Sequence, residues 1–507
     1  MTYFAAVGIK QIQSYLARSR HLWGRRGASD MLAYLTAVDN SDIPAIERRF
    51  RSAAEILADF DSVTFNKDAL DADSVLSISG DSLEDVRAAT EELARNIKLH
   101  LPAAHVQTTI RKADNYSGVI RAENAQELAE IVQYPPLRIE FPLAHHCDEC
   151  SSGMAARVEQ TPEGPQSLCP DCLSRLTQTG RNSLLDRARL DRPQVGFLVE
   201  QAMLSELGYE QAQDFKELAA MGDLRSRGRR VHTGNHVATI FADGNGFGKL
   251  FTALRTEAAR TAQGLTELRE ISKAVKLATA DALKSAIQHI CLDDEKTMPA
   301  IPHILGGDDI LVTVPATRAW PFLIHFLQQM REAAGQGKFG PDPNRISFSA
   351  GMVSCKLSYP IGDQVELAAD LLRSAKEAVR GRGWSYAWLD VTSEGPAVPD
   401  RVYELCDWDD LSSLIDLARQ VGRKPAGTVA GDHDGNNAAL STIRQELAIR
   451  DPKLRTYHLW HLAERLLGAG DLFDRSFGPD WRKDTGVVCD SRIKDLQAAL
   501  SIMRWYA

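Results

Sequence analysis

The stretch from Ile301 to Val314 constrains the fold of this chain more than any other. Apolar and β-branched residues run into Gly306-Gly307-Asp308-Asp309 and out of it again, which is the pattern of a β-hairpin with glycines supplying positive φ at the turn. The turn would then hold two adjacent carboxylates at the tip of a buried ribbon. Mg²⁺ prefers carboxylate oxygens and keeps positions open for water and phosphate. Taken alone, such a tetrapeptide is more often an ordinary hairpin turn.

A second candidate ligand, Asp243, lies earlier in the chain. It ends the apolar segment Val237–Ala242 and precedes a glycine-rich turn that leads into a helical pattern. Antiparallel pairing of this strand with the hairpin would bring Asp243 beside Asp308 and Asp309. Three carboxylates around two divalent ions suit nucleotidyl transfer, because the ions activate the attacking oxygen and clamp the triphosphate. The order strand, helix and hairpin therefore predicts a palm fold.

At these motifs the chain resembles the large polymerase and cyclase subunit of type III CRISPR effector complexes. The motifs that carry the resemblance are Phe241–Leu250 and Leu305–Ile310, and the likeness is strongest at 237–255 and 301–390. Ile346–Val353 and Leu371–Glu377 match the next palm strand and helix of that family, and Gly8–Ser29 resembles the start of its first palm. The resemblance covers roughly residues 1–390 and implies ATP as substrate, with Mg²⁺ or Mn²⁺ at the active site.

The predicted active site combines metal ligands with a phosphate cradle. We assign Asp243, Asp308 and Asp309 as the catalytic metal ligands. Glycines let the backbone approach a phosphate, and a helix N-terminus offers free N–H donors. The family's triphosphate-binding lysine corresponds to Lys376, whereas Lys249 either adds charge or points to solvent. The residues predicted to contact the nucleotide are Gly244, Asn245, Gly246, Phe247, Gly248, Gly306, Gly307 and Lys376.

Two Cys-x-x-Cys pairs, Cys147/Cys150 and Cys169/Cys172, lie between the two expected palms. Their separation matches a tetrathiolate zinc ribbon, and zinc there would be structural because four thiolates leave no position for substrate. The alternative is four unliganded thiols. His145 and His146 are adjacent and could substitute as ligands, although bystander roles fit the pattern better.

Length and composition bound the remaining possibilities. A chain of 507 residues should hold roughly three to four domains. We expect an α+β protein with two ferredoxin-like palms, a zinc-ribbon insertion and a C-terminal helical bundle. The expected domains are a first, degenerate palm (1–140), a zinc-binding and helical linker domain (141–230), a second palm carrying the active site (231–390) and the bundle (400–507). In the first palm, Ser79-Gly80-Asp81 lies near the expected turn but lacks the doubled carboxylate.

The charge distribution limits where nucleic acid could bind. The net charge of −9 argues against a globally basic nucleic-acid binder, so any RNA contact must be local. The arginine cluster at 225–230 predicts either a phosphate-backbone contact or a solvated loop, with equal weight. Arg25 and Arg26, in an expected turn, are either phosphate contacts or solvated charges, the second being favoured.

The cellular location is expected to be the cytoplasm. The sequence has no apolar run of about 20 residues and no basic and apolar leader, so we expect no membrane contact and no signal peptide. Eight cysteines, four of them in tight pairs, are typical of metal binding in a reducing compartment.

Two features depart from the family's pattern. The family often begins with an HD phosphohydrolase domain, whereas this sequence begins at the palm, and His433-Asp434 lacks the spaced histidines of a metal nuclease. We therefore expect no DNase activity. Asn245 stands where relatives commonly carry a second aspartate, which leaves the cation preference open. In the bundle, Trp408, Trp460 and Trp505 are either partner anchors or core residues, the core being favoured.

Three functional hypotheses remain. The first is an effector-complex subunit that converts ATP to cyclic oligoadenylates on target RNA binding. The resemblance implies a small helical subunit, backbone subunits, crRNA and target RNA as its partners. The second is a stand-alone anti-phage nucleotide cyclase. The third, a catalytically silent RNA-binding scaffold, is disfavoured because clustered carboxylates repel one another unless metal is bound.

Overall fold

The computed structural model describes most of the chain. The described residues are 2–39, 50–73, 75–136, 145–161, 164–178, 198–222, 224–226, 229–231, 234–340, 346–399, 401–421, 434–478, 480–481, 488, 490–503 and 505. Within them, none of the helices combines the length and the apolar character that crossing a membrane requires.

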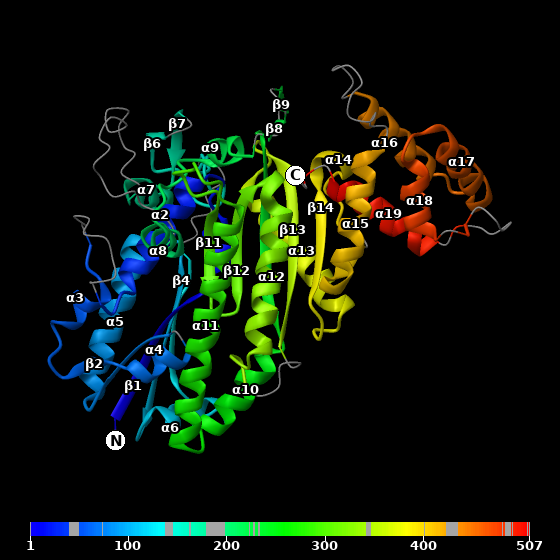
Figure 1. Ribbon diagram of the computed structural model, residues 1–507. Coiled ribbons are helices and arrows are strands. Elements are labelled where there is room, and N and C mark those ends of the chain that lie inside the picture. The colour runs from blue at the N-terminus through cyan, green and yellow to red at the C-terminus, as the bar shows by residue number, and fades with distance from the viewer. Residues whose placement is uncertain are drawn as a thin grey trace.

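The first palm is built on a five-stranded antiparallel sheet with strand order β2-β3-β1-β4-β5 (Figure 1). Helices α2 and α5 cover one face of this sheet, and α4 and α6 lie toward the other, facing the second palm. Alternating apolar residues such as Ala5 and Val7 on β1 explain why one face is buried. The elements are β1 (Thr2–Lys10), α1 (Ile12–Ala17), α2 (Leu22–Leu35), α3 (Ala53–Leu57), β2 (Val63–Phe65), α4 (Lys67–Asp73), β3 (Leu76–Gly80), α5 (Leu83–His100), β4 (His105–Ala113), α6 (Tyr116–Asn124) and β5 (Glu130–Tyr134).

Three sequence expectations for this palm need correction. The segment from Trp23 to Gly27 is not a turn but lies inside helix α2. From the sequence, Asn66-Lys67-Asp68 is predicted to lie in a loop between two strands, but Lys67 and Asp68 begin helix α4. Ser79-Gly80-Asp81 is not at the position of the second palm's acidic turn, because Gly80 pairs with Tyr3 at the beginning of β1 and so lies at the opposite end of the sheet.

Two hairpins and three helices, which include a small cysteine-rich ribbon unit, connect the palms. The elements are the hairpin β6 (Arg157–Thr161) and β7 (Gly164–Leu168), the helices α7 (Pro170–Gln178), α8 (Leu198–Leu207) and α9 (Phe215–Ala220), and the hairpin β8 (Leu224–Ser226) and β9 (Arg229–Val231). The arginine cluster falls on this last hairpin, and its side chains lie outside what the structure describes. Its predicted RNA contact therefore stays a prediction.

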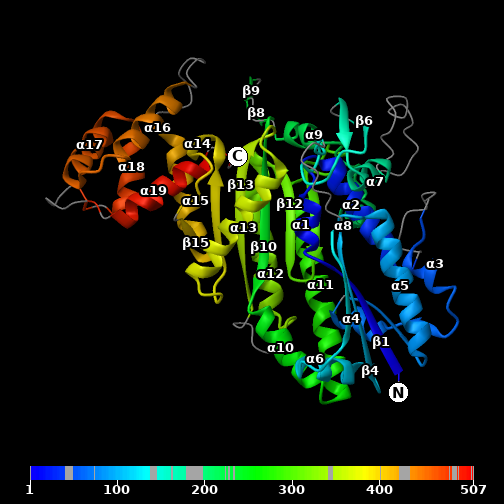
Figure 2. The same cartoon turned by 180° about the vertical axis from the view of Figure 1, so that it is seen from behind.

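The second palm has a six-stranded mixed sheet with order β11-β12-β10-β13-β14-β15. Helices α11 and α12 cover one face (Figure 1) and α13 covers the other (Figure 2). The helical pattern after the glycine turn predicts one long helix to about Gln288, but the structure has two helices, α10 and α11, with Thr261 capping the second. The elements are β10 (His236–Asn245), α10 (Phe247–Ala258), α11 (Ala262–Ile290), β11 (Ile301–Gly306), β12 (Asp309–Pro315), α12 (Ala319–Gly335), β13 (Ser347–Lys356), α13 (Ile361–Ala378), β14 (Ser385–Asp390), α14 (Val391–Glu394) and β15 (Val402–Glu404).

The C-terminal helices pack on the second palm and share its core. Trp408 stacks on Trp320 of α12 with ring centroids 5.4 Å apart, and the Trp505 indole donates a hydrogen bond to Asp390. Both Trp408 and Trp505 are buried, which confirms the core interpretation for these two residues. The helices are α15 (Trp408–Gln420), α16 (Asp434–Leu447), α17 (Pro452–Arg465), α18 (Ala469–Phe477) and α19 (Asp490–Met503). The expected α+β fold, with two palms, a ribbon and a helical bundle, is confirmed.

The central strands of the two palms end in the same way. β1 is followed by Gln11 (φ 53°) and helix α1, and β10 is followed by Gly246 (φ 84°) and helix α10. Each left-handed residue reverses the chain from strand to helix. Aligning Gln11 with Gly246 matches Gly8 to Asp243, and the two palms can then be compared position by position.

Candidate active site

The three predicted catalytic aspartates come together at one end of the second palm sheet. Asp243 on β10 pairs directly with Asp309 at the start of β12, so the two side chains lie on the same face of the sheet. Asp308 belongs to the turn that precedes β12, and its carbonyl accepts a hydrogen bond from the Gly244 N–H at 3.1 Å. The predicted antiparallel pairing of strand and hairpin is therefore present.

Glycines are required at this corner for steric reasons. Gly307 has φ 68°, a conformation that glycine adopts at no steric cost. A Cβ atom on Gly306 would lie 2.3 Å from an Asp309 carboxylate oxygen, and one on Gly244 would lie 2.9 Å from Asp308 Oδ2 and 2.1 Å from the Phe247 ring. The glycines thus leave the space that the carboxylates occupy.

The carboxylates are close enough to perturb one another. Burial, together with the nearby charge of Asp243, raises the pKa of Asp308 from 3.8 to about 6, while Lys376 opposes the shift. Burial and the Asp243 charge disfavour the ionised form of Asp308, so a bound cation would stabilise that form. The chemistry of the donor set fits hard divalent ions, which bind carboxylate oxygens.

Lys376 bridges to this cluster from helix α13. Its Nζ donates hydrogen bonds to Asp243 Oδ2 at 2.6 Å and to the Gly244 carbonyl at 3.0 Å. The lysine expected to meet the triphosphate therefore lies directly against a predicted metal ligand, and it neutralises that carboxylate in the present state.

The glycine-rich turn after β10 divides its residues between core and surface. Phe247 is buried against Phe339 and Phe348, so only its backbone faces a ligand. Gly248 and Lys249 are exposed at the start of α10. Asn245 is buried, and its amide nitrogen donates to the Ser347 and Ser349 hydroxyls and the Gly383 carbonyl, which leaves its Oδ1 without a hydrogen-bond partner.

The four predicted zinc ligands also converge. The Sγ atoms of Cys147, Cys150, Cys169 and Cys172 all lie within 4.8 Å of one another, and Cys150 Sγ is 3.8 Å from Cys169 Sγ. A tetrahedral zinc ion with Zn–S bonds of about 2.3 Å separates its ligands by about 3.8 Å. The buried thiols therefore fit a closed structural zinc site. Among the described residues this is the one group of three or more potential ligands packed so closely, so the aspartates are spread more widely than the thiols.

Two acidic residues that anchor the ribbon to the first palm were missed by sequence reasoning. Buried Glu149 accepts hydrogen bonds from Ser19 Oγ and from the His21 backbone N–H. Asp171 accepts from Tyr15 Oη at 3.0 Å and pairs with Arg175 at 2.8 Å. The available signal was positional, since each acid is the residue just before the second cysteine of its pair.

Arg25 and Arg26 are neither solvated loop charges nor phosphate contacts. Both are buried at 3% exposure on α2. Arg26 forms a two-point ion pair with buried Glu200, and Arg25 Nε donates to the Ser19 carbonyl at 3.0 Å. Arg26 therefore connects the first palm to linker helix α8, and Arg25 holds α2 against the segment that follows α1. Neither interpretation weighed from the sequence was correct.

Comparison with protein families decides what the second palm is. Residues 236–383 match the family described as Cas10/Cmr2, second palm domain. This part of the chain is similar to the second palm domain of that family. The match contains Asp243, Asp308, Asp309 and Lys376, and it confirms the resemblance drawn from the sequence.

Solved structures extend the likeness to the whole fold. A Csm1–Csm4 cassette in complex with one ATP is 12% identical with a TM-score of 0.54, covering 100% of this chain and 70% of that chain. A Csm1–Csm4 cassette with pppApApA is 12% identical with a TM-score of 0.51, covering 99% and 69%. Csm1 in T. onnurineus is 13% identical with a TM-score of 0.50, covering 100% and 70%. At these identities the likeness establishes the fold alone. A comparison with curated proteins gave no match.

Proposed function

We propose that the second palm is a nucleotidyltransferase that joins ATP into cyclic oligoadenylates, acting as a subunit of a type III CRISPR effector complex. The observation that carries the proposal is the convergence of Asp243, Asp308 and Asp309 at the end of β10 and β12, with Lys376 against them. The relatives crystallised with ATP and with pppApApA support adenine nucleotides as the substrate class.

In this proposal each residue of the cluster has a distinct task. Two divalent ions would lower the pKa of the attacking ribose hydroxyl and stabilise charge on the leaving pyrophosphate. Asp243, Asp308 and Asp309 would hold these ions, and ionisation of Asp308 would accompany binding because its pKa is raised. Once the ions neutralise Asp243, Lys376 would release that carboxylate and bind the triphosphate instead.

The glycine-rich turn would hold the phosphates. Gly244, Gly246 and Gly248 allow the backbone of the turn and of the first turn of α10 to approach a phosphate closely. Gly306 and Gly307 do the same at the hairpin. The unpartnered Oδ1 of Asn245 offers one buried acceptor, and Phe247 contributes its backbone N–H.

The proposed partners are the other subunits of the effector complex, with crRNA and target RNA. The relatives crystallised as Csm1–Csm4 cassettes support subunit association. The four cysteines are proposed to hold a structural zinc ion between the palms, which would fix the ribbon without taking part in the reaction.

A mass-spectrometric product assay tests the proposal. The purified chain is incubated with ATP and Mg²⁺ or Mn²⁺, with and without co-purifying RNA and proteins, beside an Asp308→Ala/Asp309→Ala variant. Adenylate products that need target RNA and disappear in the variant support the effector subunit. Products from the chain alone favour the stand-alone cyclase. If the folded, zinc-loaded protein forms no adenylate product in any condition, the scaffold hypothesis is the one that remains.

A further inference from the structure

The row of carboxylates at the end of the second palm sheet continues into buried hydroxyl groups. Asp243 pairs with Asp309 on one side and with Ser349 of β13 on the other. Ser349 in turn pairs with Ser385 of β14. Residues paired directly across neighbouring strands project from the same face, so two carboxylates and two hydroxyls form one line on the face that α13 covers. Both serines are fully buried, so their hydroxyls bind other parts of the protein and no ligand.

These hydroxyls belong to a chain of hydrogen bonds that begins at the Asn245 side chain and ends on helix α13. The Asn245 amide nitrogen donates to Ser349 Oγ at 2.8 Å, and Ser349 Oγ lies 2.8 Å from Ser385 Oγ. Ser385 Oγ donates to the Ala375 carbonyl at 3.0 Å. Ala375 immediately precedes Lys376, so the chain connects the glycine-rich turn to the helical turn that carries the lysine.

The two ends of the chain fix the direction in which its hydrogen bonds point. The Asn245 amide also faces the Gly383 carbonyl at 3.0 Å, and a carbonyl can only accept, so the amide nitrogen is the atom on this side. The one hydroxyl hydrogen of Ser385 goes to the Ala375 carbonyl, so Ser349 must donate to Ser385. Each donor therefore points from the glycine-rich turn toward α13, and the chain holds the Ser385 hydroxyl in its donating orientation.

The carbonyl at the end of the chain is one that the helix does not satisfy by itself. Ala375 lies in the last turn of α13, where carbonyls lack the usual intrahelical donor. The Val379 N–H, four residues further on, bonds the Glu377 carbonyl instead. Ser385 therefore provides the donor for a carbonyl in the same helical turn as Lys376.

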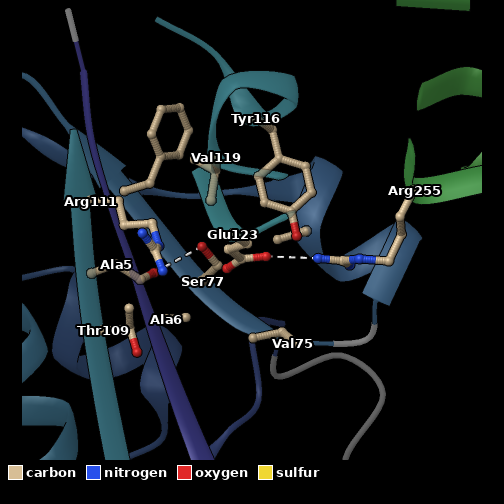
Figure 3. A pocket seen from close by; sticks show the side chains of 12 residues that line it. Ala5, Ala6, Val75, Ser77, Thr109, Arg111, Tyr116, Val119, Glu123 and Arg255 are labelled. Atoms are coloured by element: carbon tan, nitrogen blue, oxygen red, sulfur yellow. Dashed lines mark hydrogen bonds and ion pairs between the residues drawn. The ribbon is translucent and has the colours of Figure 1, made fainter. Parts of the chain in front are cut away.

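Close packing fixes the middle of α13 on its sheet. Gly351 of β13 lets the helix approach so closely that a Cβ atom there would lie 2.1 Å from the Ala368 carbonyl oxygen. A cavity of about 20 Å³ borders α13, whereas the matching face of the first palm has a cavity of about 90 Å³ between its sheet and α6. Arg111 and the ion pair of Glu123 with Arg255 line that larger cavity (Figure 3). With the middle of α13 fixed, the hydrogen bond from β14 sets where its last turn lies.

We propose that Ser385 is a positioning residue for Lys376, held in its donating orientation by Ser349 and Asn245. The inference rests on the proposed function of the second palm, in which the lysine meets the triphosphate. It adds an indirect link between the glycine-rich turn and the lysine to the direct one, the hydrogen bond from Lys376 Nζ to the Gly244 carbonyl at 3.0 Å. Loss of the Ser385 hydroxyl removes the donor in the last turn of α13, so the lysine is held less firmly while the carboxylates on β10 and β12 stay in place.

Binding of α,β-methylene ATP in the presence of Mg²⁺ tests the proposal without turnover. This analogue carries an intact triphosphate but cannot release pyrophosphate, and isothermal titration calorimetry on the full chain measures its dissociation constant. Ser385→Ala should raise that constant about three- to tenfold, which is the effect of losing one hydrogen bond. Ser385→Thr keeps the hydroxyl and should recover most of the lost affinity. Ser354→Ala, which removes a buried hydroxyl near the other end of β13, is the matched control and should bind as wild type.

A double-mutant cycle separates positioning of the lysine from general destabilisation. In a Lys376→Met background the lysine is absent, so adding Ser385→Ala should cause no further loss of affinity. A purely structural role of the serine would weaken binding by the same factor in both backgrounds. If Ser385→Ala is poorly folded, Ser385→Cys takes its place in the cycle, because a thiol of similar size is a much weaker donor.

The outcomes distinguish this inference from the proposed function. Wild-type affinity in Ser385→Ala, or a loss of affinity that persists in the Lys376→Met background, overturns the inference alone. If the wild-type chain binds the analogue but forms no adenylate product in the mass-spectrometric assay, the proposed function fails and the positioning role stands on the binding data. Absence of saturable binding by the wild-type chain would overturn both.

Discussion

The two palms share one framework and differ at the end of the central strand. In the second palm, Asp243 pairs with Asp309 and the hairpin brings in Asp308. In the first palm, the matching positions are Gly8 and Val75, and helix α4 packs on α11 where the second palm has its acidic hairpin. The framework therefore places side chains at this corner, and the residues there decide whether a carboxylate cluster exists.

The palms also differ in what supports them. The first palm is held to the cysteine ribbon by hydrogen bonds to Glu149 and Asp171, both of which are buried. The second palm packs against the C-terminal helices through apolar contacts such as the stacking of Trp320 on Trp408. One support consists of a four-cysteine cluster and buried polar groups, and the other of buried apolar area.

The largest expected effect comes from moving the carboxylate between palms. Asp243→Asn should lower product formation by about a thousandfold or more, because metal-ion stabilisation of the transition state amounts to several kcal/mol. Adding Gly8→Asp to that variant should restore nothing, since Val75 offers no second carboxylate. Product assays on both variants check this, and recovery of activity in the double variant would contradict the comparison.

Loss of the ribbon should affect the first palm before the second. Cys169→Ser/Cys172→Ser should abolish zinc binding and lower the first unfolding transition by about 5 °C or more, because structural zinc sites contribute folding free energy. Zinc content by mass spectrometry and calorimetry measure the outcome. Cys291→Ser, which removes a cysteine of the second palm, is the control and should change neither quantity.

Replacing the matched glycines of β10 and β1 by alanine should change stability by different amounts. Gly244→Ala is expected to destabilise the protein by about 1–3 kcal/mol through overpacking against Phe247, and to lower activity with it. At the matched position Gly8, a Cβ atom meets nothing within 4 Å, so Gly8→Ala should change stability by less than about 0.5 kcal/mol. Equal melting temperatures for the two variants would count against the proposed crowding.

The smallest effect is a pH dependence of metal binding. The pKa of Asp308 in the folded protein is about 6, so Mn²⁺ should bind about tenfold more tightly at pH 7 than at pH 5, as the competing proton is lost. Without metal the sign for stability is opposite. The folded state binds this proton more tightly than the unfolded state, so the contribution of Asp308 to the free energy of unfolding falls as pH rises from about 4 to about 6. Titration calorimetry with Mn²⁺ checks the first expectation and scanning calorimetry of the metal-free protein against pH checks the second. Asp308→Asn should remove both dependences.

Much of the fold followed from local patterns. The hairpin at Ile301–Val314, the strand ending at Asp243 and the spacing of the cysteine pairs each predicted what the structure contains. These features are local, because turn residues, alternation and knuckle spacing restrict the backbone within a few residues. Helix α4 and the burial of Arg25 and Arg26 did not follow, since each depends on partners distant in the sequence. The break between α10 and α11 was also missed, although its signal is local, because the Thr261 side chain caps α11 by accepting from the Gly264 N–H.

The sequence by itself determined the chemistry available to this chain, because the acids, the glycines and the cysteine pairs each occur in short motifs. Only the tertiary structure decided how these residues are held. It set Lys376 against Asp243, buried Glu149 and Asp171 against the first palm, and left a charged cavity at Arg111. The physical reason is that burial, ion pairing and cavity volume are properties of side chains brought together from distant segments, and no single stretch of the chain encodes them.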